Sequence, residues 1–263
     1  MATGQPPKKG EYQKPPQGAL RSPCPVLNAL SNHGYIPRDG RNIHAADLKA
    51  GFAYLGFDPI LKNYLVDGAF KVHEDDPKKV TKDTDVLGLR NPGQVDENGI
   101  PVLNLDQVGR PNAVEHPCSM TRRDREQGDC VSFDPELMAQ LIGAAGTDGH
   151  YSMSDIAKYR KLRYAQQKRD NAELKFDVQQ HTLACGEIGA FQATFGRGLF
   201  YKIPLSYMKA MFVDERLPLK EGWTPRWTWL GFPELAGVMF WIRHYAWPSK
   251  EFGVETVDSK KAK

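Results

Sequence analysis

The chain has 263 residues and a formal net charge of +3, with 40% hydrophobic residues, 25% charged residues and four cysteines. This length suffices for one large domain with a sizeable core. So mild a charge, with no basic-aromatic array, predicts no nucleic-acid partner. Four cysteines are too few for a disulfide scaffold, and no run approaches the roughly 20 apolar residues of a membrane span.

The N-terminal segment is rich in Pro, Lys, Gly and Gln and cannot form a core of its own. We expect residues 1–22 to be an extension that wraps the surface or stays mobile. The segment lacks the apolar stretch of a signal peptide, and the chain has no Asn-x-Ser/Thr acceptor for glycosylation. We therefore expect either an intracellular protein or the mature form of a secreted one.

A helix is predicted directly after Cys24, in residues 22–30 (SPCPVLNAL). Pro25 is preorganised for the first helical position, and the following apolar residues recur at helical spacing. The free N–H groups and positive dipole end of a helix N-terminus favour an anion, so the Cys24 sulfur is suited to be a thiolate ligand or nucleophile. The alternative is a cysteine that merely packs beside a helix-starting proline.

The rest of the chain is predicted to be mainly α-helical, in one domain over residues 23–250 with a polar tail at 251–263. A long loop is expected over Glu74–Pro111, and a short strand over Leu199–Ile203. The predicted helices are His44–Leu55 with Asn42 as its cap, Leu61–Val72, Asp134–Ala145, Ser154–Leu174, Glu187–Phe195, Ser206–Arg216 and Pro233–Tyr245. A run of aromatic residues is expected in the core: Trp223, Trp227, Trp229, Phe232, Phe240, Trp241, Tyr245 and Trp247.

A second group of polar residues lies in residues 114–124 (VEHPCSMTRRD). Glu115, a nearby backbone carbonyl and the Ser119 hydroxyl are hard oxygen donors of the kind that Mg²⁺, Mn²⁺ or Ca²⁺ prefers. His116 is suited to acid–base work or hydrogen bonding. The alternative is a polar loop that caps the next helix through Ser119 or Thr121.

Two cysteines flank this loop. Cys118 and Cys130 are close enough in sequence to form a local disulfide, and two reduced thiols are an equal alternative. A zinc site built from Cys118, Cys130 and a histidine is the least supported option.

The third group is residues 183–196 (LACGEIGAFQATFG), where one carboxylate stands in an otherwise apolar helix. Ile188, Phe191 and Phe195 form a core stripe, and Glu187 lies within reach of that face. A buried carboxylate is costly unless it is paired, and such a group is suited to shuttle protons. The alternative is a surface glutamate in the first turn of a helix.

Together these stretches resemble the fungal haem-thiolate peroxidases, that is, chloroperoxidase and the short unspecific peroxygenases. The matching parts are residues 23–40 (PCPVLNALSNHGYIPRDG), then Glu115-His116 with Ser119, then Gly186-Glu187 in its apolar helix. The resemblance extends from about Ser22 to Leu219. It implies a compact helical domain of the chloroperoxidase type that encloses a haem.

The resemblance also implies roles for single residues. Cys24 would be the axial thiolate of haem b. Glu115, the His116 carbonyl and Ser119 would hold Mg²⁺ or Mn²⁺ near a haem propionate. Glu187 would be the catalytic acid–base, with the His116 side chain beside it.

One position departs from the family pattern, which is Glu-His-Asp, because the third residue here is Pro117. An aspartate could orient the histidine and stabilise its charged form. We therefore expect His116 to be looser in orientation and less readily protonated.

The resemblance implies an enzyme that uses H₂O₂ to insert oxygen into C–H or C=C bonds of small apolar or aromatic substrates, with one-electron peroxidase activity beside it. Three alternatives stay open: a haloperoxidase that oxidises halide, a biosynthetic peroxidase dedicated to one metabolite, and a haem carrier without turnover. A homodimer is possible, and the sequence does not give the oligomeric state.

Overall fold

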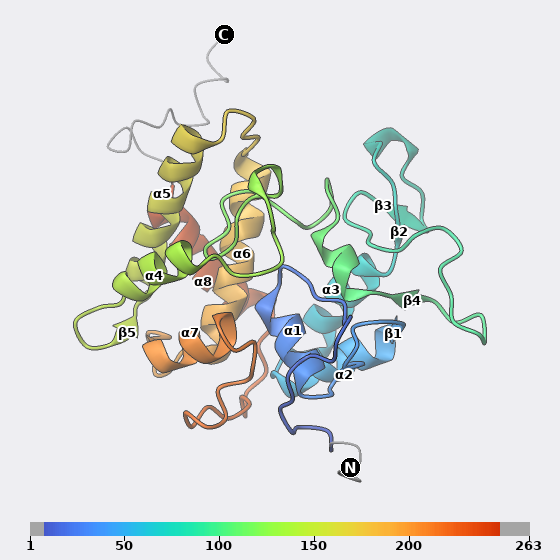
Figure 1. Ribbon diagram of the computed structural model, residues 1–263, viewed down its shortest axis with the longest axis horizontal. Helices are drawn as coiled ribbons and strands as arrows, with labels where there is room; N and C mark the ends of the chain where they lie inside the picture. Colours follow the sequence, from blue (N-terminus) through green and yellow to red (C-terminus); the bar gives the residue numbers. More distant parts are fainter. Residues whose placement is uncertain (1–7, 248–263) are drawn as a thin grey trace. The chain divides into compact units, whose positions relative to one another are not determined.

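Helices make up most of the regular structure between residues 8 and 247, the part of the chain that the computed structural model describes (Figure 1). The mainly α-helical prediction is therefore confirmed. The chain divides into two compact units. The first comprises the chain up to Glu115 together with Asp214–Trp229, and the second comprises His116–Val213 and the chain from Leu230.

The first unit contains three helices whose starts follow from local sequence. Pro25 and Pro59 occupy first-turn positions of α1 and α3, and the Asp58 carboxylate accepts from the Leu61 N–H. The elements of this unit are α1 (Pro25–Asn32), β1 (Ile43–His44), α2 (Ala45–Tyr54), α3 (Pro59–Ala69), β2 (Val72–His73), η1 (Pro77–Lys79), β3 (Thr84–Asp85), β4 (Val102–Leu103) and η2 (Leu105–Gly109).

Short two-residue ladders fasten the long connection after α3. β1 pairs antiparallel with β4, and β2 pairs parallel with β3. The predicted loop over Glu74–Pro111 therefore contains two strands and two 3₁₀ turns. The predicted Asn42 cap is wrong: Asn42 has φ 46°, and α2 is capped by His44 in a capping box with Asp47.

The N-terminal segment, as far as the structure describes it, lies along the first unit. The Gly10 and Gln13 amides donate to the carbonyls of His33 and Asn32, and the Leu20 amide donates to the Asp39 carbonyl. The predicted tail over 251–263 lies outside the described residues. The predicted domain boundaries stay predictions.

The second unit contains the longer helices, and side-chain caps begin α4, α5 and α6, whereas α7 and α8 have none. Asp134 caps α4, Ser152 and Asp155 form a capping box on α5, and Asp177 begins α6. The elements are η3 (Arg125–Gln127), α4 (Pro135–Gly143), β5 (His150–Tyr151), α5 (Met153–Asp170), α6 (Val178–Phe195), β6 (Ile203–Pro204), α7 (Leu205–Phe212) and α8 (Phe232–Tyr245). β5 pairs antiparallel with β6, so the predicted strand over Leu199–Ile203 shrinks to its last residue.

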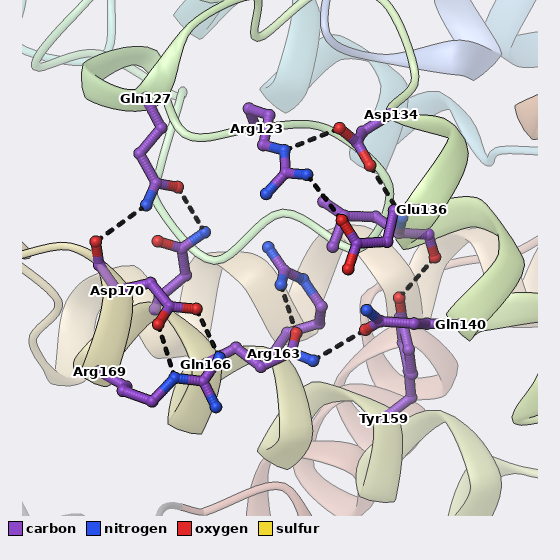
Figure 2. Close-up of polar contacts among 12 residues, drawn as sticks. Arg123, Gln127, Asp134, Glu136, Gln140, Tyr159, Arg163, Gln166, Arg169 and Asp170 are labelled. Carbon is purple, nitrogen blue, oxygen red and sulfur yellow. Dashed lines mark hydrogen bonds and ion pairs between the residues drawn. The ribbon is translucent and has the colours of Figure 1, made fainter.

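Within this unit, α8 packs against both α5 and α6 (Figure 1). Polar side chains join α4 and α5: Gln166 donates to Gln140, and the Tyr159 hydroxyl lies 2.9 Å from the Leu137 carbonyl (Figure 2). The Arg123 guanidinium pairs with Asp134 at 2.7 Å and with Glu136 at 3.2 Å at the start of α4. These contacts fix α5 beside the loop that begins at His116.

The aromatic run is only partly a core, which corrects the expectation. Trp223 is 5% exposed, whereas Trp227 and Trp229 are 96% and 61% exposed. Phe240 and Tyr245 of α8 are also exposed. Aromatic composition alone does not distinguish a buried face from an exposed one, because a large apolar side chain can serve either.

No helix among residues 8–247 has the length and apolar character needed to cross a membrane.

Candidate functional site

Cys24 stands at the N-cap of α1, as the sequence predicts. Its φ and ψ are −83° and 109°, the extended conformation of a capping residue, and Pro25 follows it at the first helical position. The first-turn amides of Val26 and Leu27 have no intrahelical acceptor, because the helix begins there. The positive end of the α1 dipole lies at Cys24, a position that suits an anionic group. The Cys24 side chain itself makes no capping hydrogen bond to the first-turn amides.

Asn28 fixes the chain in front of this cysteine. Its side-chain oxygen accepts from the amide and the hydroxyl of Ser22 at 2.9 and 3.0 Å, and its side-chain nitrogen donates to the Ser22 carbonyl and to Glu215. Asn28 is completely buried, whereas Cys24 is half-buried. The sequence reasoning assigned Asn28 no role, although an asparagine four residues after a capping cysteine in an apolar helix is a visible signal.

The four cysteines differ in accessibility. Cys118, Cys130 and Cys185 are buried, and Cys24 alone among the four keeps partial exposure. Cys118 and Cys130 are reduced thiols in the structure. Burial raises the pKa of the Cys118 thiol to about 12, so that sulfur stays protonated near neutral pH. A half-buried sulfur at a helix N-terminus fits an axial haem ligand, and the three buried sulfurs do not.

His116 and Glu187 are brought together in the second unit, 71 positions apart in the chain. The His116 Nε2 lies 3.2 Å from the Glu187 Oε2, and the side chains are 8% and 54% exposed. The His116 Nδ1 lies 2.8 Å from the Pro117 carbonyl oxygen. A carbonyl only accepts, so Nδ1 carries a proton, and the contact with Glu187 shares one further proton between imidazole and carboxylate.

The expectation that His116 is looser and less readily protonated than a histidine followed by aspartate stays a prediction, and the structure shows which groups hold the ring. The ring is buried and bonded at both nitrogens. Burial opposes the charged form, but the Glu187 carboxylate outweighs it and raises the pKa of His116, with the Pro117 carbonyl adding to the rise and Arg160 opposing it. Position 117 has no aspartate side chain, and its backbone carbonyl oxygen accepts the hydrogen bond from the His116 ring instead.

Helix α6 carries Glu187 to this position. The helix begins at Val178, well before the predicted start at Glu187, so the carboxylate stands in mid-helix and is not a first-turn glutamate. Ile188, Phe191 and Phe195 are buried as predicted. Glu187 itself keeps more than half of its exposure, so the expected burial of this carboxylate is wrong.

Two glycines of α6 allow α8 to approach closely. A Cβ built on Gly189 would lie 3.3 Å from the backbone of Met239, and one on Gly186 would lie 3.5 Å from its sulfur. Near the N-terminus of α6 and the C-terminus of α8, the Arg243 side chain donates to the Thr182 hydroxyl, and the Arg243 carbonyl lies 3.2 Å from the His181 Nε2. These contacts lock α6 against α8 and so fix the position of Glu187.

The oxygen donors expected to hold a divalent cation have different surroundings. Glu115 and Ser119 are half-buried. The Ser119 carbonyl accepts from Arg163 at 2.8 Å, whereas no hydrogen bond from a described residue reaches its hydroxyl, which leaves that oxygen available as a hard ligand. Residues 8–247 contain no group of three or more His, Cys, Asp or Glu side chains that could hold a metal ion, so the zinc alternative is not supported.

Ser119 and Thr121 are not the caps of the helix that follows. Asp134 caps α4, and its amide donates to the Thr121 carbonyl. The alternative of a simple capping loop therefore does not account for the polar residues of 114–124.

Known proteins match most of this chain in sequence. The model of "Peroxidase, family 2" matches residues 10–228. The chain is 28% identical over 228 residues to a chloroperoxidase of Leptoxyphium fumago, covering 81% of this chain and 57% of the relative. It is 30% identical over 210 residues to an aromatic peroxygenase of Coprinellus radians, covering 76% of this chain and 77% of that protein.

A third relative is a dothistromin biosynthesis peroxidase of Dothistroma septosporum, 27% identical over 161 residues, or 58% of this chain and 36% of the relative. The chain thus spans little more than half the length of the chloroperoxidase and about a third of this biosynthetic enzyme. The family match covers most of the chain, from the segment before Cys24 to beyond α7. The chain therefore belongs to peroxidase family 2, the haem-thiolate peroxidases of fungi.

Proposed function

We propose that the protein is a haem-thiolate peroxygenase that uses hydrogen peroxide to insert oxygen into C–H or C=C bonds of small apolar or aromatic molecules, with one-electron peroxidase activity beside it. Family membership makes it an oxidoreductase of the peroxidase type. The observation that carries the proposal is the contact of 3.2 Å between His116 and Glu187. A protein that only carried haem would have no use for a proton-sharing pair.

Cys24 would hold the iron of haem b through its thiolate. Its place at the start of α1 and its partial exposure support this role. Haem bound in this way supplies the oxidising power, since an anionic sulfur ligand donates electron density that favours O–O cleavage. Asn28 hydrogen-bonds to the amide and the carbonyl of Ser22 and so fixes the backbone that leads into Cys24 at the helix end.

Glu187 would manage the proton of the peroxide. Its carboxylate would take a proton from one oxygen of hydrogen peroxide and return it to the other, which leaves as water when the O–O bond breaks. The remaining oxygen atom is the one that the organic substrate receives, with haem supplying the oxidising power. His116 would hold the Glu187 Oε2 through Nε2 and share the transferred proton, while the Pro117 carbonyl keeps Nδ1 protonated. The exposure of Glu187 gives small molecules access to its carboxylate.

Glu115, the His116 carbonyl and Ser119 would bind Mg²⁺ or Mn²⁺. One carboxylate, one carbonyl and one hydroxyl make a hard-oxygen set that suits either ion, and water or a further anionic oxygen would complete the coordination shell.

Replacement of the proposed acid tests the function. We expect Glu187→Gln to bind haem as the unchanged protein does and to lose roughly 10²–10⁴-fold in peroxide-dependent turnover, because an amide cannot accept and return the proton. The measurement is steady-state oxidation of a small aromatic substrate by purified, haem-loaded protein. Glu173→Gln, an exposed carboxylate in the same unit, serves as the matched control.

Full activity of Glu187→Gln would contradict the assignment of the acid. The same assay separates the alternatives. A higher rate of halide oxidation than of substrate oxygenation would favour a haloperoxidase, in keeping with the relative named chloroperoxidase. Activity on one elaborate metabolite only would favour a dedicated biosynthetic enzyme, in keeping with the dothistromin relative.

A further inference from the structure

The orientation of His116 depends on the backbone that follows it. The Pro117 carbonyl oxygen that lies 2.8 Å from Nδ1 belongs to the peptide unit between Pro117 and Cys118, and Cys118 turns the chain directly after this unit with φ 64°. This left-handed conformation is unfavourable for a residue with a Cβ and persists where neighbouring groups enforce it. The groups that enforce it therefore control the imidazole.

Helix α5 presents three donors to three successive carbonyls of this loop. The Arg160 Nη1 donates to the Cys118 carbonyl at 2.7 Å, and the Arg163 Nε donates to the Ser119 carbonyl at 2.8 Å. The Tyr159 hydroxyl lies 2.9 Å from the Met120 carbonyl and equally far from the Leu137 carbonyl of α4, so its one proton is shared between the two oxygens. All three side chains are nine-tenths or more buried.

Asp124 binds a backbone N–H group of the same loop. Its carboxylate accepts from the Cys118 N–H at 2.9 Å. In the amide orientation that satisfies both of its ends, Gln167 of α5 donates to Asp124 and accepts from Arg163. The loop from Cys118 to Met120 is thus bonded on both sides, and every one of these bonds except that of Asp124 comes from α5.

Burying these donors costs free energy, which indicates that the geometry of the loop matters. Two buried guanidinium groups lose their hydration, and Arg160 has no carboxylate partner among the described residues. If the geometry of the loop did not matter, its carbonyl groups could hydrogen-bond to water, and no buried arginine would be needed to satisfy them. The donors instead fix each of three consecutive peptide units.

We propose that α5 is a backbone clamp, in which Tyr159, Arg160 and Arg163 are positioning residues that hold the turn at Cys118 and thereby keep the Pro117 carbonyl on His116. The clamp touches neither peroxide nor haem. It acts through the backbone on the imidazole that holds Glu187. This inference rests on the proposed role of His116 and Glu187.

A pair of tyrosines gives a matched test. Tyr159→Phe removes a hydroxyl that lies between the Met120 carbonyl of the loop and the Leu137 carbonyl of α4. Tyr151→Phe removes an equally buried hydroxyl that donates to the Leu141 carbonyl, also in α4 but away from the loop. Both substitutions keep the ring, so both variants fold. Hydrogen–deuterium exchange of the haem-loaded proteins, read by mass spectrometry on peptides that cover 116–122, reports the loop independently of activity.

We expect Tyr159→Phe to speed exchange in this segment by roughly two- to tenfold, the range that the loss of one hydrogen bond gives. The turnover number should fall by a comparable factor, with the KM for the organic substrate unchanged. Tyr151→Phe should change neither reading. Added to Glu187→Gln, Tyr159→Phe should cause no further loss of turnover, because the clamp acts through that pair.

Unchanged exchange in Tyr159→Phe overturns the clamp, and so does faster exchange with unchanged turnover. Equal effects of the two tyrosine variants on the loop also overturn it. Full activity of Glu187→Gln, by contrast, defeats the proposed function and leaves the exchange result to stand by itself.

Discussion

At the scale of single residues, Pro117 shows how a backbone oxygen can replace a side chain. The sequence could indicate that His116 and Glu187 act together, since the resemblance aligns both. It could not give the tautomer, because that depends on the left-handed turn at Cys118. Nothing in the spacing of residues 114–124 predicts this turn, which is enforced by α5 from about 40 positions away.

Replacing Pro117 with the aspartate of the family pattern should therefore change the turnover number little. Pro117→Asp offers a carboxylate to a ring whose Nδ1 already has an acceptor, so we expect turnover to change by less than about threefold, or less than about 1 kcal/mol in the barrier. The measurement is the turnover number with saturating peroxide. A gain of tenfold or more would show that the carbonyl does not hold the imidazole.

At the scale of elements, local signals predicted helix existence well and helix length less well. The Pro25 and Asp134 signals placed α1 and α4 correctly, because caps are local. The start of α6 was missed by nine residues: Asp177 and Gln180 form its capping box in a polar stretch with no apolar periodicity. Packing against α8, which the sequence does not show, stabilises that first half.

The contact between α6 and α8 gives a stability prediction. Gly237→Ala on α8 adds a methyl group where nothing lies within 4 Å, so it should gain up to about 1 kcal/mol in unfolding free energy from helix propensity. Gly189→Ala gains the same propensity but meets the Met239 backbone at 3.3 Å. We expect it to be at least about 1 kcal/mol less stable than Gly237→Ala, because packed backbones cannot yield freely. Urea unfolding measures both, and equal gains would refute close packing.

At the scale of the whole molecule, each unit contains one buried neutral histidine. In the first unit, His33 donates to the Gly10 carbonyl and accepts from the Leu217 amide, and burial lowers its pKa. In the second, burial lowers the pKa of His181 to about 4. Nothing in the sequence indicated that these two are buried. His33 lies inside the matching stretch 23–40 without an assigned role, and His181 precedes the third group of residues, in a polar stretch.

Both histidines should make the fold sensitive to acid. A lowered folded-state pKa means that the unfolded chain binds the proton first, so stability is full above about pH 6.5 and falls as the pH drops towards 4. His181 alone should cost about 3 kcal/mol over that window. Urea unfolding at stepped pH should show a smaller loss for His181→Gln than for the unchanged protein. Parallel curves would contradict a buried neutral His181.

The central claim is that the protein transfers an oxygen atom from peroxide to an organic molecule, and isotopic labelling tests it most directly. Purified, haem-loaded protein is given hydrogen peroxide labelled with heavy oxygen in ordinary water, together with a small aromatic substrate. The account predicts a hydroxylated or epoxidised product that carries the label, and its loss in Glu187→Gln. Product oxygen drawn from water, or only coupled one-electron products, would contradict it.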